Sequence, residues 1–130
     1  MTQVAKPPPH PNDVSAPYWA AAAQGRLIVQ SCGACGTLRH YPRLLCNRCY
    51  SAEVVWKQAS GRGAVHSWVV AHHVFHQGFA NDVPYTLVTV DLEEGVRAVG
   101  RWLGSRPLAL GLPVQASFKL RDETADLTFE

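Results

Sequence analysis

Apolar and polar residues alternate along the second half of the chain, which is the pattern of half-buried β-strands. Five stretches carry it: residues 64–75, 85–92, 96–103, 114–121 and 125–129. Turn signals that contain glycine separate some of them, at residues 93–95 and 111–113. The first strand is the longest and follows the glycines of residues 61–63. This arrangement predicts a five-stranded OB-fold barrel over residues 59–130.

The first part of the chain predicts a flexible arm and a short helix. Residues 1–12 contain four prolines, so we expect an extended arm that is either mobile or laid on a neighbouring surface. Asp13 or Ser15 can cap the helix, and Pro17 suits its first turn. A glycine at position 25 ends it, which gives a helix within residues 13–25.

Three short apolar stretches follow the helix, at residues 27–31, 37–41 and 54–58. They lead into and out of two turns that contain cysteine, which is the layout of a zinc ribbon over residues 26–58. The predicted fold is therefore mainly β with an N-terminal helix, a zinc ribbon and then the OB-fold.

All four cysteines of the chain lie in this ribbon, as the CxxC pairs Cys32/Cys35 and Cys46/Cys49 with ten residues between the pairs. Two such turns facing each other supply the four thiolates that tetrahedral Zn²⁺ prefers. We predict one structural zinc ion per chain, because four protein ligands leave no position for substrate or water. Iron in the same site, two disulfides and metal-free thiol pairs are the alternatives.

The residues around the two CxxC pairs differ from each other. Gly36 follows the first pair and fits a turn that needs a positive φ. Tyr50 follows the second pair, which predicts some backbone strain or a different turn. His40 lies between the pairs, and we interpret it as a surface histidine because the cysteines complete the ligand set.

Composition narrows the class of protein. A chain of 130 residues suits one domain, or two very small ones that share an interface. Charged residues make up only 17%, and a surface short of charge indicates that a partner covers part of it. The chain has no apolar run of the roughly 18 residues that a membrane span needs, and its N-terminus lacks a signal peptide's apolar core. We therefore expect a cytoplasmic protein without a membrane partner.

Histidines make residues 66–76 the most reactive stretch of the chain. On one extended strand, His66, His72 and His76 share a face. At roughly 3.3 Å per residue, His66 and His72 are about 20 Å apart and His72 and His76 about 13 Å, too far to bind one ion. We expect these histidines at a ligand or subunit interface, or as ordinary surface or core side chains.

An ordered set of short motifs runs through residues 15–130. Besides the CxxC pairs and Gly36, it comprises Tyr18-Trp19, Gly25-Arg26-Leu27, Tyr41-Pro42-Arg43, Trp56, Ser60-Gly61-Arg62-Gly63, His72-His73, Val83-Pro84-Tyr85 and Gly111-Leu112-Pro113-Val114. This set resembles the family of small proteins that join a rubredoxin-like zinc ribbon to an OB-fold, long catalogued as a domain of unknown function. Tyr50 is a departure from the family pattern.

The resemblance implies a function. Members of that family are partners of thiolase-like proteins and are associated with acyl-CoA substrates in thiolase, acyltransferase and aldolase complexes, including lipid metabolism such as steroid side-chain breakdown. The thiolase-like subunit carries the reacting residues, and the small subunit stabilises it and shapes the CoA or acyl channel. We therefore expect a non-catalytic accessory subunit in a hetero-oligomer that shares an acyl-CoA substrate with its partner.

Nine side chains are the expected contacts with CoA, the acyl group or the partner: Tyr18, Trp19, Arg39, Arg43, Trp68, His72, His73, Phe75 and His76. Arg39 and Arg43 either balance the charge of the four thiolates or meet CoA phosphates, since an arginine fork matches a phosphate. Arg97 and Arg101 share one strand face, which predicts a polar rim or an ordinary solvated face.

Two other functions stay open. An OB-fold with a zinc ribbon also suits a nucleic-acid-binding module, but 12 Lys and Arg against 10 Asp and Glu give little clustered positive charge. A self-sufficient hydrolase or lyase built on the histidines lacks an identifiable nucleophile–base pair. We therefore do not expect the chain to be an enzyme by itself.

Overall fold

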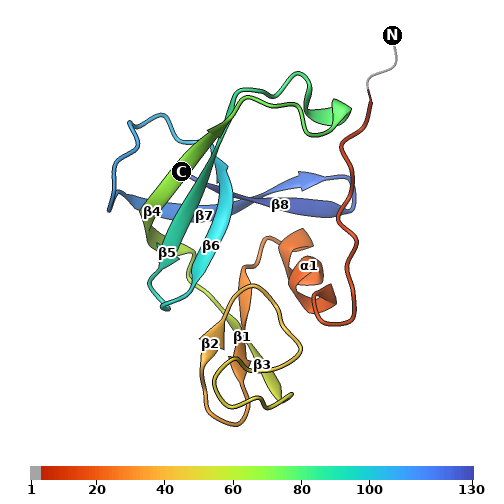
Figure 1. The fold of residues 1–130 in the computed structure, drawn as a ribbon, viewed down its shortest axis with the longest axis vertical. Helices are drawn as coiled ribbons and strands as arrows, with labels where there is room; N and C mark the ends of the chain where they lie inside the picture. The colour runs from red at the N-terminus through yellow and green to blue at the C-terminus, as the bar shows by residue number, and fades with distance from the viewer. Residues whose placement is uncertain (1–3) are drawn as a thin grey trace.

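The computed structural model describes residues 4–130, and residues 1–3 of the predicted arm lie outside the described residues. Within that range the chain forms one α-helix, one 3-10 turn and eight strands, drawn in Figure 1. Their order and bounds are α1 (Ala16–Ala23), β1 (Ile28–Cys32), β2 (Leu38–Arg39), β3 (Val54–Gln58), β4 (Arg62–Ala71), η1 (Gln77–Phe79), β5 (Tyr85–Leu92), β6 (Arg97–Trp102), β7 (Pro113–Arg121) and β8 (Thr124–Phe129). The predicted mainly β architecture with an N-terminal helix is confirmed.

Helix α1 begins directly after Ser15, but the side chain of Ser15 does not cap it. The Ser15 hydroxyl accepts the Asn12 backbone N–H over 3.1 Å, and Asn12 Oδ1 accepts the Ser15 N–H over 2.9 Å. Pro17 occupies the first turn, where no N–H donor is needed. Gly25 follows the helix with a φ of 76°, a left-handed conformation that glycine adopts without a side-chain clash.

Strand β1 is the centre of a three-stranded sheet with the order β2-β1-β3. Both neighbours are antiparallel to it, and Gln30 lies opposite Arg39 of β2 and Trp56 of β3. Strand β2 is shorter than the predicted strand of residues 37–41, because the chain turns back toward β1 after it. There the backbone N–H of Arg43 donates to Gln30 Oε1 over 2.8 Å.

Strands β4 to β8 close into a barrel in the order β4-β5-β6-β8-β7. Strands β6 and β8 are parallel, and the other neighbours are antiparallel. The barrel closes where Gly63 of β4 lies opposite both Leu92 of β5 and Val114 of β7. A Cβ at Gly63 would lie 2.5 Å from the Asp91 carbonyl oxygen, so only glycine permits this approach. The strand order is that of the five-stranded OB-fold, and the prediction of that barrel is confirmed.

One hydrophobic core runs from the barrel into the zinc ribbon. The barrel contributes Val88, Val90 and Phe129, which are fully buried, and β1 contributes Val29 to the same cluster. Tyr18 of α1 also belongs to it, because the helix packs against β8 and β1 (Figure 1). Since these parts share their apolar contacts, loss of the ribbon will also weaken the barrel.

The long strand predicted over residues 64–75 ends earlier, at Ala71. Its partner β5 begins opposite it at Tyr85, directly after Pro84, so residues 72–84 have no strand to pair with and form a loop that contains η1. The expectation that His66, His72 and His76 share one strand face is therefore wrong. Only His66 lies on the strand, next to a register shift between Val65 and Ser67.

The described part of the proline-rich arm lies along the outside of the barrel, beside η1 and the end of the β7–β8 hairpin (Figure 1). The flexibility predicted for residues 1–12 stays a prediction. Within residues 4–130, no helix is both long enough and apolar enough to cross a membrane.

Candidate metal centre and exposed hairpin surface

The two CxxC pairs sit in two turns with the same backbone hydrogen bond. In the first turn Gly36 N–H donates to the Cys32 carbonyl over 2.9 Å, and in the second Tyr50 N–H donates to the Cys46 carbonyl over 3.0 Å. Both residues are left-handed, with φ of 78° for Gly36 and 64° for Tyr50. The strain predicted for Tyr50 is therefore present, because a side chain disfavours this conformation.

The two turns bring the four cysteine sulfurs together, all within 4.8 Å of one another. Cys32 Sγ lies 3.5 Å from Cys49 Sγ, and Cys35 Sγ lies 3.7 Å from Cys46 Sγ. A tetrahedral zinc–thiolate site with Zn–S bonds of about 2.3 Å has S–S edges of about 3.8 Å. The thiols are all free and are positioned to bind one metal ion of this kind.

Backbone dipoles prepare these thiols for a metal. The N–H groups of Cys35 and Ala34 lower the pKa of Cys32 to about 6, and those of Cys49 and Arg48 lower the pKa of Cys46. The Ser51 N–H also lowers the pKa of Cys49, but the neighbouring sulfurs raise it to about 12. Repulsion from the other three sulfurs thus disfavours ionisation of the fourth thiol, and a divalent cation removes that repulsion.

Arg39 lies inside the ribbon rather than on its surface, with only 4% of its area exposed. Its Nε donates to Gln30 Oε1 over 2.7 Å, and its Nη2 donates to the Arg43 carbonyl over 3.3 Å. This guanidinium therefore holds the chain that connects the two turns. Arg43 and Arg48 carry exposed side chains.

His40 is not the surface histidine expected from the sequence. Its ring packs against Tyr41, with centroids 4.0 Å apart, and against Tyr18 at 5.4 Å. Both ring nitrogens are buried. Burial lowers the pKa of His40 to about 4, so the ring is neutral at pH 7.

The nine expected contact residues fall into two groups. Tyr18 and Arg39 are buried and serve the fold, whereas Trp19 is half-buried and lines a cavity between α1 and the barrel. The others, apart from Arg43, gather at the end of β4 and in the loop after it: Trp68, His72, His73, Phe75 and His76. The fold thus brings one contiguous stretch of the expected contacts to the surface.

This stretch extends beyond the barrel. Strand β4 pairs with β7 only from Arg62 to Ala64, but pairs with β5 as far as Ala71 opposite Tyr85. Beyond Ala64, β4 therefore has a free edge within residues 4–130, and its residues 66–70 are all exposed. Apolar residues are exposed on it: Trp68 is 37%, Val69 62%, Val70 48% and Phe75 75% exposed. We call these four residues the hairpin surface.

Two members of the hairpin surface, Val69 and Val70, are absent from the sequence-based contact list. The sequence carries a signal for these two residues. Residues 68–71 are all apolar, whereas a strand with one solvent-exposed face alternates apolar and polar residues. Such a run predicts a strand covered on both faces. In this chain both faces of the run are exposed within residues 4–130.

Comparison with known proteins identifies the family. Residues 19–55 match the ChsH2 rubredoxin-like zinc ribbon domain, and residues 56–119 match the ChsH2 C-terminal OB-fold domain. A DUF35 domain-containing scaffold protein of Methanocaldococcus jannaschii is 32% identical over 103 residues, which cover 77% of this chain and 72% of that protein. The chain belongs to the DUF35 family. Its ribbon is accordingly a zinc ribbon, with four cysteines placed for one metal ion.

Two further similar proteins carry other names. A probable enoyl-CoA hydratase alpha subunit of Thermomonospora curvata is 40% identical over 111 residues, which are 84% of this chain and 34% of that protein. The chain thus spans about a third of that relative. Among solved structures, a chain of the Ltp2-ChsH2(DUF35) aldolase superposes with a TM-score of 0.84 at 37% identity, covering 94% of this chain and 97% of that one.

Proposed function

We propose that the chain is a non-catalytic accessory subunit of a cytoplasmic complex that acts on acyl-CoA substrates, and that a thiolase-like partner carries the reacting residues. The names of similar proteins support this: one is a hydratase alpha subunit, one a scaffold and one part of an aldolase. The small subunit stabilises the partner and closes one wall of its CoA or acyl channel.

The hairpin surface is the observation that carries the proposal. An unpaired strand edge that carries exposed apolar side chains is a ready surface for association with another chain. Here Val69 and Phe75 are more than half exposed, and the β4 edge beside them is unpaired within residues 4–130. A partner that covers this surface would bury apolar area and could pair with the free β4 edge.

The polar contacts of the histidines also support an accessory role. Within residues 4–130, His66 contacts Asp91 at 3.3 Å and Arg97 at 3.5 Å, and His76 Nδ1 accepts the Gly78 N–H over 2.9 Å. These contacts join no histidine to a hydroxyl or thiol nucleophile. In the proposed complex, the side chains at the end of β4 orient substrate and exclude water, while the partner supplies the reacting residues.

The test is recovery of tagged protein from its native host, with mass spectrometry on the co-eluting proteins and zinc analysis on the same sample. A stoichiometric thiolase-like subunit with one zinc per chain would support the proposal. Replacing Phe75 with Ser should abolish recovery of that subunit. Leu110→Ser is the matched control, because Leu110 is 74% exposed but lies on a different loop. A chain that elutes alone, or with nucleic acid, would contradict the proposal.

A further inference from the structure

A polar groove of about 390 Å³ lies between the zinc ribbon and the turn that joins β5 to β6 (Figure 1). Its charged residues are Arg39 and Arg43 of the ribbon, Asp91 of β5 and Arg97 of β6, and we call it the ribbon groove. His40 also lines it but is neutral at pH 7, since burial lowers its pKa to about 4. Three cations facing one carboxylate leave a formal excess of two positive charges.

Arg39 is the buried cation of the ribbon groove. Its Nε and Nη2 donate to Gln30 and to the Arg43 carbonyl, whereas its Nη1 is buried without a hydrogen-bond partner in residues 4–130. In the same range no carboxylate lies within ion-pair distance of Arg39 or Arg43. A buried cation without a counter-charge is unfavourable, so a carboxylate in the groove would stabilise this arrangement.

The cysteine sulfurs take their hydrogen bonds from other groups. The backbone N–H of Cys35 donates to Cys32 Sγ over 3.5 Å, and that of Arg48 donates to Cys46 Sγ over 3.3 Å. The Thr37 hydroxyl lies 3.1 Å from Cys35 Sγ. Among residues 4–130 no arginine side chain donates to a sulfur. The guanidinium groups of the ribbon groove therefore keep their donors for a ligand.

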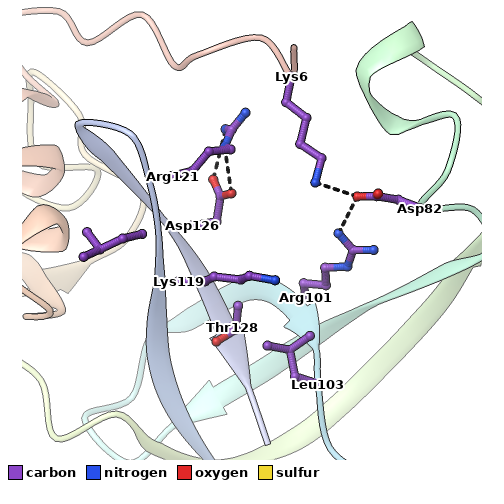
Figure 2. A pocket seen from close by; sticks show the side chains of 9 residues that line it. Lys6, Asp82, Arg101, Leu103, Lys119, Arg121, Asp126 and Thr128 are labelled. Carbon is purple, nitrogen blue, oxygen red and sulfur yellow. Dashed lines mark hydrogen bonds and ion pairs between the residues drawn. The ribbon is translucent and has the colours of Figure 1, made fainter. Parts of the chain in front are cut away.

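The cavity of about 330 Å³ under the N-terminal arm differs in this respect (Figure 2). Its charged residues are Lys6, Asp82, Arg101, Lys119, Arg121 and Asp126. Three of these four cations contact one of the two aspartates. In the ribbon groove only Arg97 has such a partner, with its Nε 2.7 Å from Asp91 Oδ1.

Apolar side chains adjoin the ribbon groove at Arg43. This residue also lines a smaller cavity of about 170 Å³, whose walls include Leu44, Val54 and Trp56. Leu44 is 67% exposed, and its neighbour Leu45 is 47% exposed. Unpaired positive charge and exposed apolar surface are therefore contiguous, which suits a peptide with acidic and aliphatic side chains.

We propose that the ribbon groove binds a glutamate or aspartate side chain of a partner protein, between Arg43 and Arg97, with aliphatic neighbours of that side chain against Leu44. A planar carboxylate matches the guanidinium fork. A phosphate carries about two negative charges at pH 7 and would lie beside Asp91, whose pKa Arg97 holds below its usual value. A free anion of any kind would also leave Leu44 uncovered.

The ribbon groove and the hairpin surface lie at opposite ends of β5. Tyr85, which pairs with the last residue of β4, and Asp91 are six positions apart, or about 20 Å at roughly 3.3 Å per residue. One chain therefore has room for both contacts, and the inference does not depend on which protein covers the hairpin surface.

The experiment is an NMR titration of the zinc-loaded full chain, labelled with nitrogen-15, with two synthetic hexapeptides. One is acetyl-Ala-Leu-Glu-Glu-Leu-Ala-amide, and the other has Gln in place of both Glu. We expect the acidic peptide to shift the Asn47 and Val96 amide signals and the Arg39 Nε–H signal. It should bind at least about tenfold more tightly than the neutral peptide, since one hydrogen bond between charged groups accounts for about that factor. Inorganic phosphate and adenosine 3′,5′-bisphosphate should both bind more weakly than the acidic peptide.

Arg43→Gln is the decisive variant, because the Arg43 side chain makes no hydrogen bond within residues 4–130 and its backbone contacts with Gln30 and Arg39 do not need it. It should weaken the acidic peptide about tenfold and leave the neutral peptide unchanged. Arg97→Gln should also weaken the acidic peptide.

Arg106→Gln is the matched control, because Arg106 is an exposed arginine that lies over Trp102 and does not line the ribbon groove. Its affinity for the acidic peptide should equal that of the wild type. Four results would each overturn the proposal: equal binding of the two peptides, no binding of either, an unchanged affinity in Arg43→Gln, or a small anion that binds as tightly as the acidic peptide.

Discussion

Tyr50 occupies in the second cysteine turn the place that Gly36 occupies in the first, with the same hydrogen bond to the first cysteine of the pair and a φ of the same sign. The Tyr50 side chain is 76% exposed, so no packing within residues 4–130 compensates for the left-handed backbone. The strain is a local cost that the metal-binding turn tolerates.

Replacing Tyr50 with Gly should therefore raise the unfolding free energy of the zinc-loaded protein. Relief of the left-handed strain, about 1–2 kcal/mol, outweighs the added entropy of glycine in the unfolded chain, about 0.5–1 kcal/mol. The expected gain of about 0.5–1 kcal/mol can be measured by chemical denaturation. Tyr50→Ala is the control, because it keeps a Cβ at the same φ. Equal stability of the Gly and Ala variants would show that this backbone is unstrained.

Cys35→Ser should release the zinc ion and unfold the ribbon. Metal binding contributes roughly 10–16 kcal/mol in small zinc domains, so loss of one ligand removes several kcal/mol of stability. Because Val29 of β1 packs in the same core as Phe129 of β8, the barrel should also melt at a lower temperature. Zinc content and thermal unfolding, with and without chelator, measure both effects.

The control for this variant is Asn47→Ser, which changes an exposed residue inside the second CxxC pair and should keep the zinc. If the proposed function is right, Cys35→Ser also loses the partner and the activity of the complex together. A Cys35→Ser protein with one zinc and unchanged stability would contradict the four-cysteine site.

His40 should make the protein less stable as the pH falls. Its pKa is about 4 in the folded protein against 6.5 for an ordinary histidine, so below pH 6.5 the unfolded chain binds the proton and the folded protein does not. Stability is therefore lost as the pH falls from about 6.5 to 4. Between pH 7 and pH 5 this amounts to at most about 2 kcal/mol.

The measurement compares the unfolding free energies of the wild type and His40→Leu at pH 7 and pH 5, with zinc content followed in parallel. The difference between the two proteins should shift by about 2 kcal/mol in favour of the variant at pH 5. A difference that does not change with pH would mean that His40 titrates alike in the folded and unfolded chain.

Gly78→Ala should lift the N-terminal arm from the barrel. A Cβ at this position would lie 2.7 Å from Lys6 Cα and 2.8 Å from the Ala5 carbonyl oxygen, which is closer than real contacts allow. Loss of the Lys6 contact should raise the pKa of Asp82, which Lys6 and then Arg101 hold below its usual value. Nitrogen relaxation at the Ala5 and Lys6 amides reports the arm's motion on the fast timescale.

The neighbouring variant Gln77→Ala is the control, since Gln77 is exposed on the same 3-10 turn. The Ala5 and Lys6 amides should become mobile in Gly78→Ala and remain as in the wild type in Gln77→Ala. Rigid arm amides in both variants would show that the packing of Gly78 does not hold the arm.

Local patterns in the sequence were enough for the metal centre and for most strands. The spacing of two CxxC pairs specifies four sulfurs around one point, and alternation specifies which strand faces enter the core. The alternating pattern predicted the wrong end for β4, because the length of β4 depends on where its partner β5 begins. His40 was misread for a similar reason: no local pattern reveals that Tyr18, more than 20 positions earlier, covers its ring.

The sequence by itself therefore determined the zinc ribbon, the OB-fold and the family, since each shows in local patterns: the cysteine spacing, the alternation within single strands and the order of short motifs. Only the tertiary structure decided that Lys6, Arg101, Lys119 and Arg121 meet around one cavity, and that Val69 and Phe75 stay uncovered. Lys6 and Arg121 come together because the arm crosses the β7–β8 hairpin from the opposite end of the chain. Contacts between such distant segments depend on how the whole chain folds, which no short stretch of sequence records.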